Sequence, residues 1–267
     1  MPSKNASPNQ KIASTKTQKN LIYTVLRSLN LILLMRIITY TIILMFLACS
    51  QDQVELPQVL IPEPVVHLPQ EMLEISGMIY NNNHTIYAHN DSGNSPKIFE
   101  LSLEEQKVLQ TISISNAENI DWEDIADDDD FIYVGDFGNN LGARENLVIY
   151  IINKNEVATQ DSVVAEIISF SYPEQIDFMP SNQHNFDCEA MLVFRDELFL
   201  FTKNRIDQKT HWYSLPKVAG EYPAQLRGDF DTRGFLTAAT ISDSKDCLLY
   251  TSPSPRDATL SRMPSSA

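Results

Sequence analysis

Apolar residues between positions 72 and 246 occur in short runs that are rich in β-branched and aromatic side chains. Asn, Asp, Gly or Pro bounds each run, which is the pattern of strands separated by turns. The spacing of the apolar positions indicates no amphipathic helix longer than two turns. The pattern therefore predicts an all-β domain over residues 72–246. The clearest expected strands are 85–88, 97–101, 131–134, 147–152, 167–172, 190–194 and 198–201.

Four segments of this region repeat one pattern, and they begin at Ser76, Glu123, Glu189 and Thr237. Each contains a strand, a tight polar turn, an aromatic-rich strand and then a polar residue. The starts are 47, 66 and 48 residues apart, and a β-propeller blade repeats about every 40–50 residues. We therefore expect an incomplete β-propeller with about four blades of six or seven. An irregular β-sandwich is the alternative.

Residues 37–48 form an uncharged apolar run before the domain. The run is shorter than the roughly 20 residues of a membrane-spanning helix, but it has the length of a signal-peptide core, about 7–15 residues. It ends in Phe-Leu-Ala-Cys49, which resembles the lipobox of bacterial lipoproteins. The resemblance implies cleavage before Cys49 and a lipid on its sulfur, so that the lipid bilayer is a partner. It implies a location in the bacterial cell envelope, at the periplasmic or outer-membrane face. A plain membrane anchor is the alternative.

The apolar run also sets the expected organisation of the N-terminal part. Residues 1–48 are the expected signal region. Because Met35 and Arg36 directly precede the run, we expect translation to start at Met35. Residues 49–71 hold the lipidated Cys49 and a proline-containing extended tether.

Residues 247–267 resemble the translation of a sequencing adapter. Residues 247–257 and 261–267 back-translate to two parts of the adapter. The three residues between them correspond in length to the adapter's index and one further base. We therefore expect the native sequence to end near Lys245 and Cys247 to have no functional role. A genuine Ser/Pro-rich tail is the alternative. With Cys49 lipidated, Cys188 would remain as a single thiol, which argues against a disulfide framework.

The charge of the chain limits its partners. Asp and Glu number 35 and Lys and Arg number 20, which gives a net charge of −15. Nucleic-acid binding requires a surplus of basic residues, so we expect no nucleic-acid partner. Much of the acidity lies in the repeated motifs, which are therefore the candidate functional positions.

Four motifs carry a resemblance to a known group of proteins. They are HNDSGNSP at 89–96, NIDWEDIA at 119–126, YVGDFGNN at 133–140, and DCEAM at 187–191 with TKN at 202–204. With these motifs, residues 76–241 resemble a group of largely uncharacterised bacterial propeller proteins. The resemblance implies the fold and no established activity. More distantly, the layout is similar to calcium-dependent lactonase and phytase-like propellers, which implies an ion held near the axis by acidic and Asn residues.

The motifs fall at equivalent positions of the repeats, so their polar side chains would meet at one mouth of a closed propeller. Carboxylates that lie close together need a proton, a bound cation or a salt bridge. Oxygen ligands without His or Cys favour Ca²⁺. An internal ring of ion pairs with Lys203 and Arg205 is the alternative. The candidate metal ligands are Asp91, Glu123, Asp136, Asn139 and Glu189.

His89 and His184 lie beside acidic motifs and are candidate general bases. The Asp run at 127–130 lacks the ligand order of an EF-hand, and we expect it to form a hairpin turn. The favoured function is a membrane-anchored lipoprotein propeller, a binding or scaffold module that takes an unidentified small molecule or protein at an acidic mouth. A Ca²⁺-dependent hydrolase of lactones or phosphoesters is the alternative, and the sequence leaves open whether the protein is an enzyme.

Overall fold

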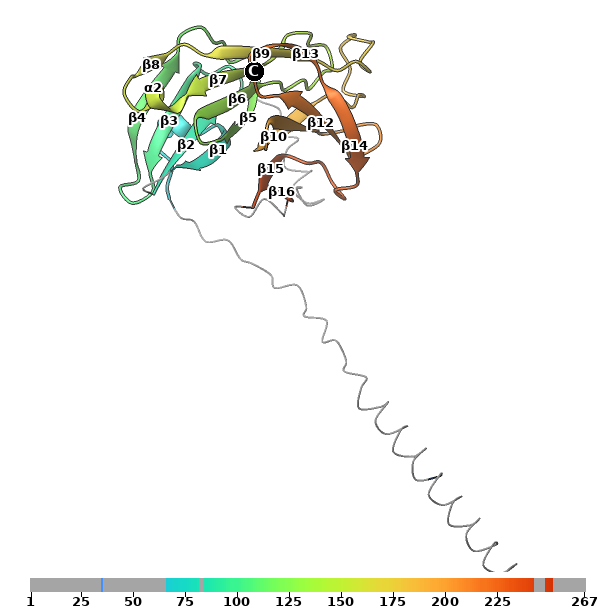
Figure 1. Ribbon diagram of the computed structural model, residues 1–267, viewed down its shortest axis with the longest axis horizontal. Coiled ribbons are helices and arrows are strands. Elements are labelled where there is room, and N and C mark those ends of the chain that lie inside the picture. Colours follow the sequence, from blue (N-terminus) through green and yellow to red (C-terminus); the bar gives the residue numbers. More distant parts are fainter. Residues whose placement is uncertain (1–34, 36–65, 82–83, 243–247, 252–267) are drawn as a thin grey trace, which may run out of the picture. The chain divides into compact units, whose positions relative to one another are not determined.

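The architecture is all-β, as the sequence predicted. The computed structural model describes residues 35, 66–81, 84–242 and 248–251. Contacts divide the chain into residues 1–62 and 63–267, and all described strands lie in the second unit. Three sheets, each built on four antiparallel strands, follow one another along the chain (Figure 1).

The strands of each sheet are joined in up-and-down order. The first sheet follows a short 3-10 helix, η1 (Gln70–Met72), and contains β1 (Ile75–Asn81), β2 (Thr85–Asn90), β3 (Lys97–Ser102) and β4 (Lys107–Ile114). The second sheet contains β5 (Trp122–Asp127), β6 (Phe131–Asp136), β7 (Leu147–Asn153) and β9 (Glu166–Ser171). The third sheet contains β10 (Cys188–Phe194), β11 (Glu197–Thr202), β12 (Thr210–Pro216) and β14 (Gln225–Phe230).

Two short strands link consecutive sheets. β8 (Ser162–Val163) pairs in parallel with β4, and β13 (Gly220–Pro223) pairs in parallel with β9. Each belongs to the connection between the third and fourth strands of the following sheet. The helix α2 (Lys154–Val157) lies in the same connection as β8. The first and second sheets are therefore each extended by a strand from the sheet that follows.

The first strands of the sheets lie next to one another. β1 contacts β5, β5 contacts β10, and β10 contacts β15 (Ala238–Ile241), which pairs with β16 (Leu248–Thr251). Apolar side chains fill the space between sheets, with Tyr87 and Trp122 between the first and second, and Tyr133 and Tyr213 between the second and third. Since the sheets cover one another, β2 is buried at every position.

A β-bulge interrupts the first strand of each sheet at the same point. The extra residue is Ser76 in β1, Glu123 in β5 and Glu189 in β10. These are the residues that begin the first three repeated segments, so the register confirms the alignment made from the sequence. A bulge turns a side chain out of the regular pleat, which places both glutamates at equivalent points of the fold.

Some predictions concern residues that the structure does not describe. They are the signal region apart from Met35, lipid attachment at Cys49, the tether up to residue 65, and the adapter-like end 247–267 apart from residues 248–251. Within the described part of the chain, no helix is long and apolar enough to cross a membrane. The Asp run at 127–130 lies in the hairpin between β5 and β6, as predicted.

Candidate functional site

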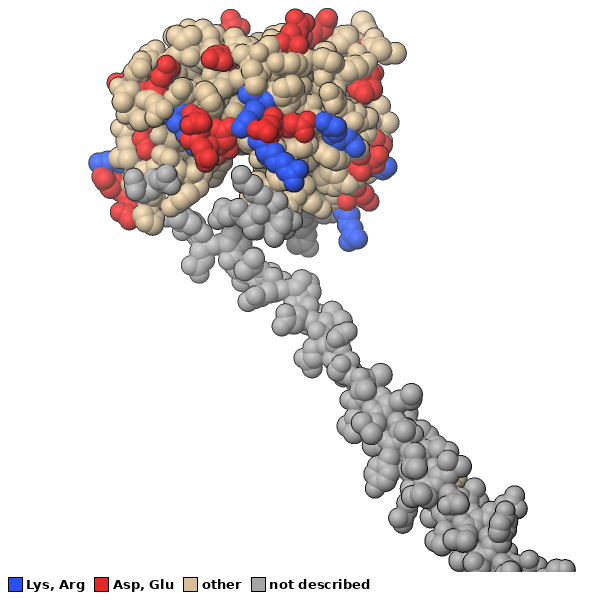
Figure 2. Space-filling model, in the orientation of Figure 1, with Lys and Arg blue, Asp and Glu red and all other residues tan. Residues whose placement is uncertain are grey.

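Five acidic side chains gather where the first strands of the second and third sheets begin. Asp121 and Asp187 directly precede β5 and β10, the bulge residues Glu123 and Glu189 follow two positions later, and Asp91 comes directly after β2. We call these five residues the acidic cluster. On the face seen in Figure 2, acidic and basic side chains lie beside one another in a band across the domain.

Asp91, Asp121 and Glu123 form the part of the cluster that we call the acidic triad. One carboxylate oxygen of each residue lies within 4.8 Å of the others, and all three side chains are partly buried. Asn140 Nδ2 donates a hydrogen bond to Asp121 Oδ2 at 3.3 Å. Among the described residues, no Lys or Arg forms an ion pair with the triad.

Gly138 makes room for two of these carboxylates. A Cβ at this position would clash with Asp121 Oδ2 and Glu123 Oε1, so the backbone lies directly against both oxygens. The Gly138 N–H donates to the backbone carbonyl of Asp121 at 3.1 Å, which ties the loop after β6 to the start of β5. The second glycine of the YVGDFGNN motif therefore has a steric role at the site.

Burial and like charge raise the pKa of the triad carboxyls. The pKa of Glu123 rises to about 10, first because the group is buried and then because Glu189, Asp121 and other acids surround it. Burial also raises the pKa of Asp121, with a further contribution from Asp91 and an opposing one from Arg144. At neutral pH the triad therefore holds a proton on Glu123 unless a cation compensates its charge.

The other part of the cluster is compensated by basic side chains. Lys203 Nζ pairs with Glu189 Oε1 and lies 3.7 Å from Asp187 Oδ2, while Arg205 Nη2 lies 2.7 Å from the same Asp187 oxygen. The Asn139 N–H donates to Asp187 Oδ1 at 2.9 Å. Burial raises the pKa of Glu189 to about 8, although the nearby Lys203 opposes this shift. In this part of the cluster the carboxylates form ion pairs with Lys203 and Arg205, which is the alternative to a metal site that the sequence left open.

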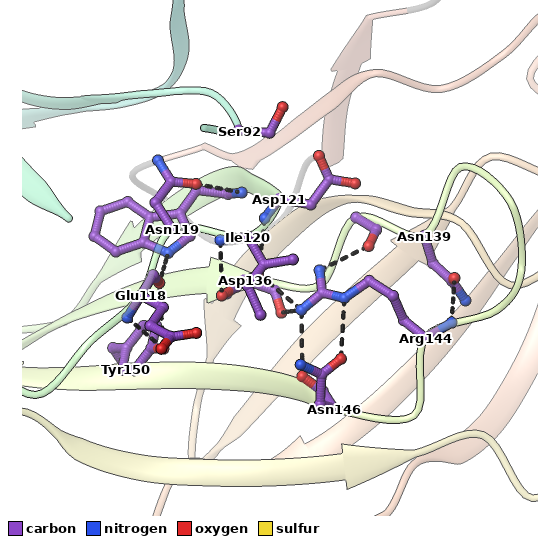
Figure 3. A network of polar contacts seen from close by, with 12 residues as sticks. Ser92, Glu118, Asn119, Ile120, Asp121, Asp136, Asn139, Arg144, Asn146 and Tyr150 are labelled. Carbon is purple, nitrogen blue, oxygen red and sulfur yellow. Dashed lines mark hydrogen bonds and ion pairs between the residues drawn. The ribbon is translucent and has the colours of Figure 1, made fainter. Parts of the chain in front are cut away.

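Two of the predicted ligands, Asp136 and Asn139, are engaged in backbone and Arg144 contacts. Asp136 is fully buried, pairs with Arg144 Nη2 at 2.9 Å, and accepts the Asp121 N–H at 3.0 Å (Figure 3). Asn139 Oδ1 accepts the Arg144 N–H at 3.0 Å. Figure 3 shows the Asp121 side chain extending away from this network. The structure therefore brings Asp91 and Glu123 together with Asp121, and holds Asp136 at the end of β6 and Asn139 in the loop that follows it.

The sequence reasoning missed Asp124, which links two sheets. Its Oδ2 accepts the Met191 N–H of β10 at 2.7 Å, and its Oδ1 accepts the Ile125 N–H at 2.8 Å. Burial raises the pKa of Asp124 to about 7, although both hydrogen bonds oppose the shift. Asp121 and Asp187 were also missed, yet each lies two residues before a bulge glutamate, and this shared spacing is a signal that could have identified them.

Neither histidine contacts the triad. His89 is fully buried, and its ring centroid lies 5.4 Å from that of Trp122 in an edge-to-face arrangement. Burial lowers the pKa of His89. Its Nδ1 lies 3.0 Å from the Asn90 carbonyl. His184 Nδ1 accepts the Phe186 N–H at 3.1 Å, and its Nε2 lies 3.2 Å from the carbonyl oxygen of Asn140. Both rings are held by backbone groups, and His89 is out of reach of a substrate.

No model of a known protein family matches the chain, and no curated protein matches it. Function is therefore inferred from the contacts and charges of the site. Their main feature is asymmetry, because one part of the acidic cluster has basic partners and the acidic triad has none among the described residues.

Proposed function

We propose that this protein is a lipid-anchored β-propeller binding module whose acidic mouth holds Ca²⁺. The lipid anchor at Cys49, and with it the cell envelope as location, is supported by the sequence. The propeller is supported by the three up-and-down sheets, the contacts between their first strands, and the bulges at equivalent positions. In this arrangement the acidic cluster lies where the first strands converge.

One observation carries the cation site. Three carboxylates lie within 4.8 Å of one another without an ion pair to any described Lys or Arg. Such a group is stable with protons or with a cation. All its oxygens are hard ligands, and neither His nor Cys belongs to the triad, which favours Ca²⁺ over Zn²⁺. Ca²⁺ takes about 6–8 oxygens, so the triad would supply part of the shell and water or the bound ligand the rest.

The hydrolase alternative has less support than the binding function. A general base must come within hydrogen-bond distance of the proton that it removes. His89 is fully buried and His184 is held by Asn140 and Phe186. In the proposed module Ca²⁺ therefore has a binding role, and the ligand is a small molecule or protein with oxygen donors.

Calorimetric titration of the full chain in detergent with CaCl₂ at pH 7.5 tests this function. We expect one site and, because Glu123 gives up its proton to the ion, release of about one proton per Ca²⁺. Titrations in two buffers with different ionisation enthalpies measure this release. Glu123→Gln should weaken binding by about tenfold or more, since fewer ligand charges lower Ca²⁺ affinity, and should remove the proton release.

Glu197→Gln is the matched control, because Glu197 pairs with Arg227 and does not belong to the acidic cluster. This variant should bind Ca²⁺ like the unmodified chain. Absence of binding at millimolar Ca²⁺, or equal affinity of the Glu123→Gln variant, would overturn the proposed cation site.

A further inference from the structure

A cleft lies beside the third sheet, and none of the residues that line it belongs to the acidic cluster. It has a volume of about 370 Å³, within the range of roughly 300–1,000 Å³ of small-molecule sites. The loop between β9 and β10, residues Leu141 and Gly142, Ile206, and the strands β12 and β14 form its walls. The cleft is therefore built by segments that are far apart in the sequence.

The outer walls of this cleft are apolar and exposed. Ile176 is 91% exposed and Met179 is 75% exposed, and Leu141 and Ile206 are each more than half exposed. Single exposed apolar residues are common, but several that line one cleft indicate a ligand-binding surface. These side chains can cover the hydrocarbon part of a bound molecule.

The floor of the cleft contains polar groups without partners. His211 and Tyr213 project from the same face of β12, since they are two residues apart on a strand. Tyr213 is fully buried, and its hydroxyl has no hydrogen-bond partner in the described part of the chain. The same holds for His211 Nδ1, while His211 Nε2 lies 3.3 Å from Asp207. Buried polar groups normally have a partner, so these atoms point to a bound molecule or water.

The cleft has acidic lining residues and two histidines, His184 and His211. Glu174 and Asp177 line it, and the described lining residues include no Lys or Arg. Burial raises the pKa of Tyr213, and the charge of Glu174 raises it further. A positively charged group would be attracted there, and the partly exposed ring of Phe186 can also face a cation.

We propose that this cleft binds a small organic cation, a primary amine on an apolar ring or chain. The apolar part contacts Ile176 and Met179, and the ammonium lies near the carboxylates of Glu174 and Asp177. This site is independent of the acidic triad and would give the protein a second ligand class.

Two probes with the same phenylethyl group and opposite charge test the proposal. The full chain is titrated with 2-phenylethylamine and with 3-phenylpropanoate, and binding is followed by calorimetry. We expect the amine to bind at least about tenfold more tightly than the carboxylate, because the charged lining residues are acidic. Glu174→Gln should remove most of this preference, whereas Glu156→Gln, an exposed acid on α2, should retain it.

Two further measurements separate this site from the acidic triad and from loss of folding. Glu123→Gln, or saturation with Ca²⁺, should leave amine binding unchanged. Asp177→Asn should weaken amine binding several-fold with an unchanged Tm, because it removes an exposed charge from the lining of the cleft. Equal binding of both probes, no amine binding, displacement of the amine by Ca²⁺, or no effect of Glu174→Gln would each overturn the proposal.

Discussion

Glu123 and Glu189 occupy the same bulge position in consecutive sheets and yet differ in charge compensation. The residue directly after the second strand of each sheet explains the difference. After β11 this residue is Lys203, which pairs with Glu189, whereas after β6 it is the buried Phe137, which cannot neutralise Glu123. Repeats that share a backbone geometry can therefore differ in chemistry through a single side chain.

At this residue scale we predict that Gly138→Ala weakens Ca²⁺ binding by about tenfold or more. The new Cβ would clash with Asp121 Oδ2 and Glu123 Oε1, so the two ligands would have to separate. Calorimetric titration with CaCl₂ measures the effect. In the control variant Gly93→Ala the Cβ meets no atom within 4 Å, but its φ of +76° is unfavourable for Ala. This control should lose about 1 kcal/mol of stability and keep its Ca²⁺ affinity. Unchanged binding by Gly138→Ala would contradict the prediction.

At the scale of elements, side chains connect the first strands of neighbouring sheets. Ser76 Oγ donates to the Glu123 carbonyl at 2.8 Å and links β1 with β5. Asp124 Oδ2 accepts the Met191 N–H and links β5 with β10. Both contacts lie at or next to a bulge, where the regular ladder is interrupted and a side chain can bond across sheets.

We predict that Asp124→Ala lowers the free energy of unfolding by about 2–4 kcal/mol. The substitution leaves the buried N–H groups of Met191 and Ile125 without their acceptor, and each unpaired group costs about 1–3 kcal/mol. Urea denaturation followed by tryptophan fluorescence measures this loss. Asp129→Ala, in the exposed hairpin between β5 and β6, is the control and should change stability by less than about 0.5 kcal/mol. A loss equal to that of the control would show that the inter-sheet contact does not stabilise the fold.

The strands were not equally predictable from the sequence. β2, β6 and β11 pack between neighbours and are rich in apolar residues, so their runs stand out. β14 is mostly exposed and carries charged residues, so its pattern resembles a loop. β8 and β13 were missed because they have two to four residues and pair with a strand of the preceding sheet, a relationship that local periodicity does not encode.

At the scale of the whole molecule, the buried carboxyls make stability depend on pH. The pKa is about 7 for Asp124, about 8 for Glu189 and about 10 for Glu123, against ordinary values of 3.8 for Asp and 4.5 for Glu. Between the ordinary and the raised values, the folded protein binds more protons than the unfolded chain. The free energy of unfolding therefore falls as the pH rises through this window.

We predict that, without divalent cations, Tm falls steadily from about pH 5 to pH 9. Millimolar Ca²⁺ should raise Tm most at the alkaline end, because the ion replaces the proton on Glu123 and binds the folded state. Thermal unfolding at a series of pH values, with Ca²⁺ or with a chelator, measures both effects. A Tm that rises from pH 5 to pH 8 in the chelator series would contradict the raised pKa values.

The sequence by itself determined the all-β class, the repeated segments and the positions of most inner strands, because apolar runs and turn residues are local features. It also placed Glu123 and Glu189 at equivalent points of two repeats. Only the tertiary structure decided which acids have partners, since the pairing of β10 with β11 brings Lys203 and Arg205 to their carboxylates, and the loop between β6 and β7 brings Arg144 to Asp136. The same holds for the triad of Asp91, Asp121 and Glu123. Its charge density arises because the end of β2 and the start of β5 meet in space. The sequence of either segment alone does not determine the distance between two separate sheets.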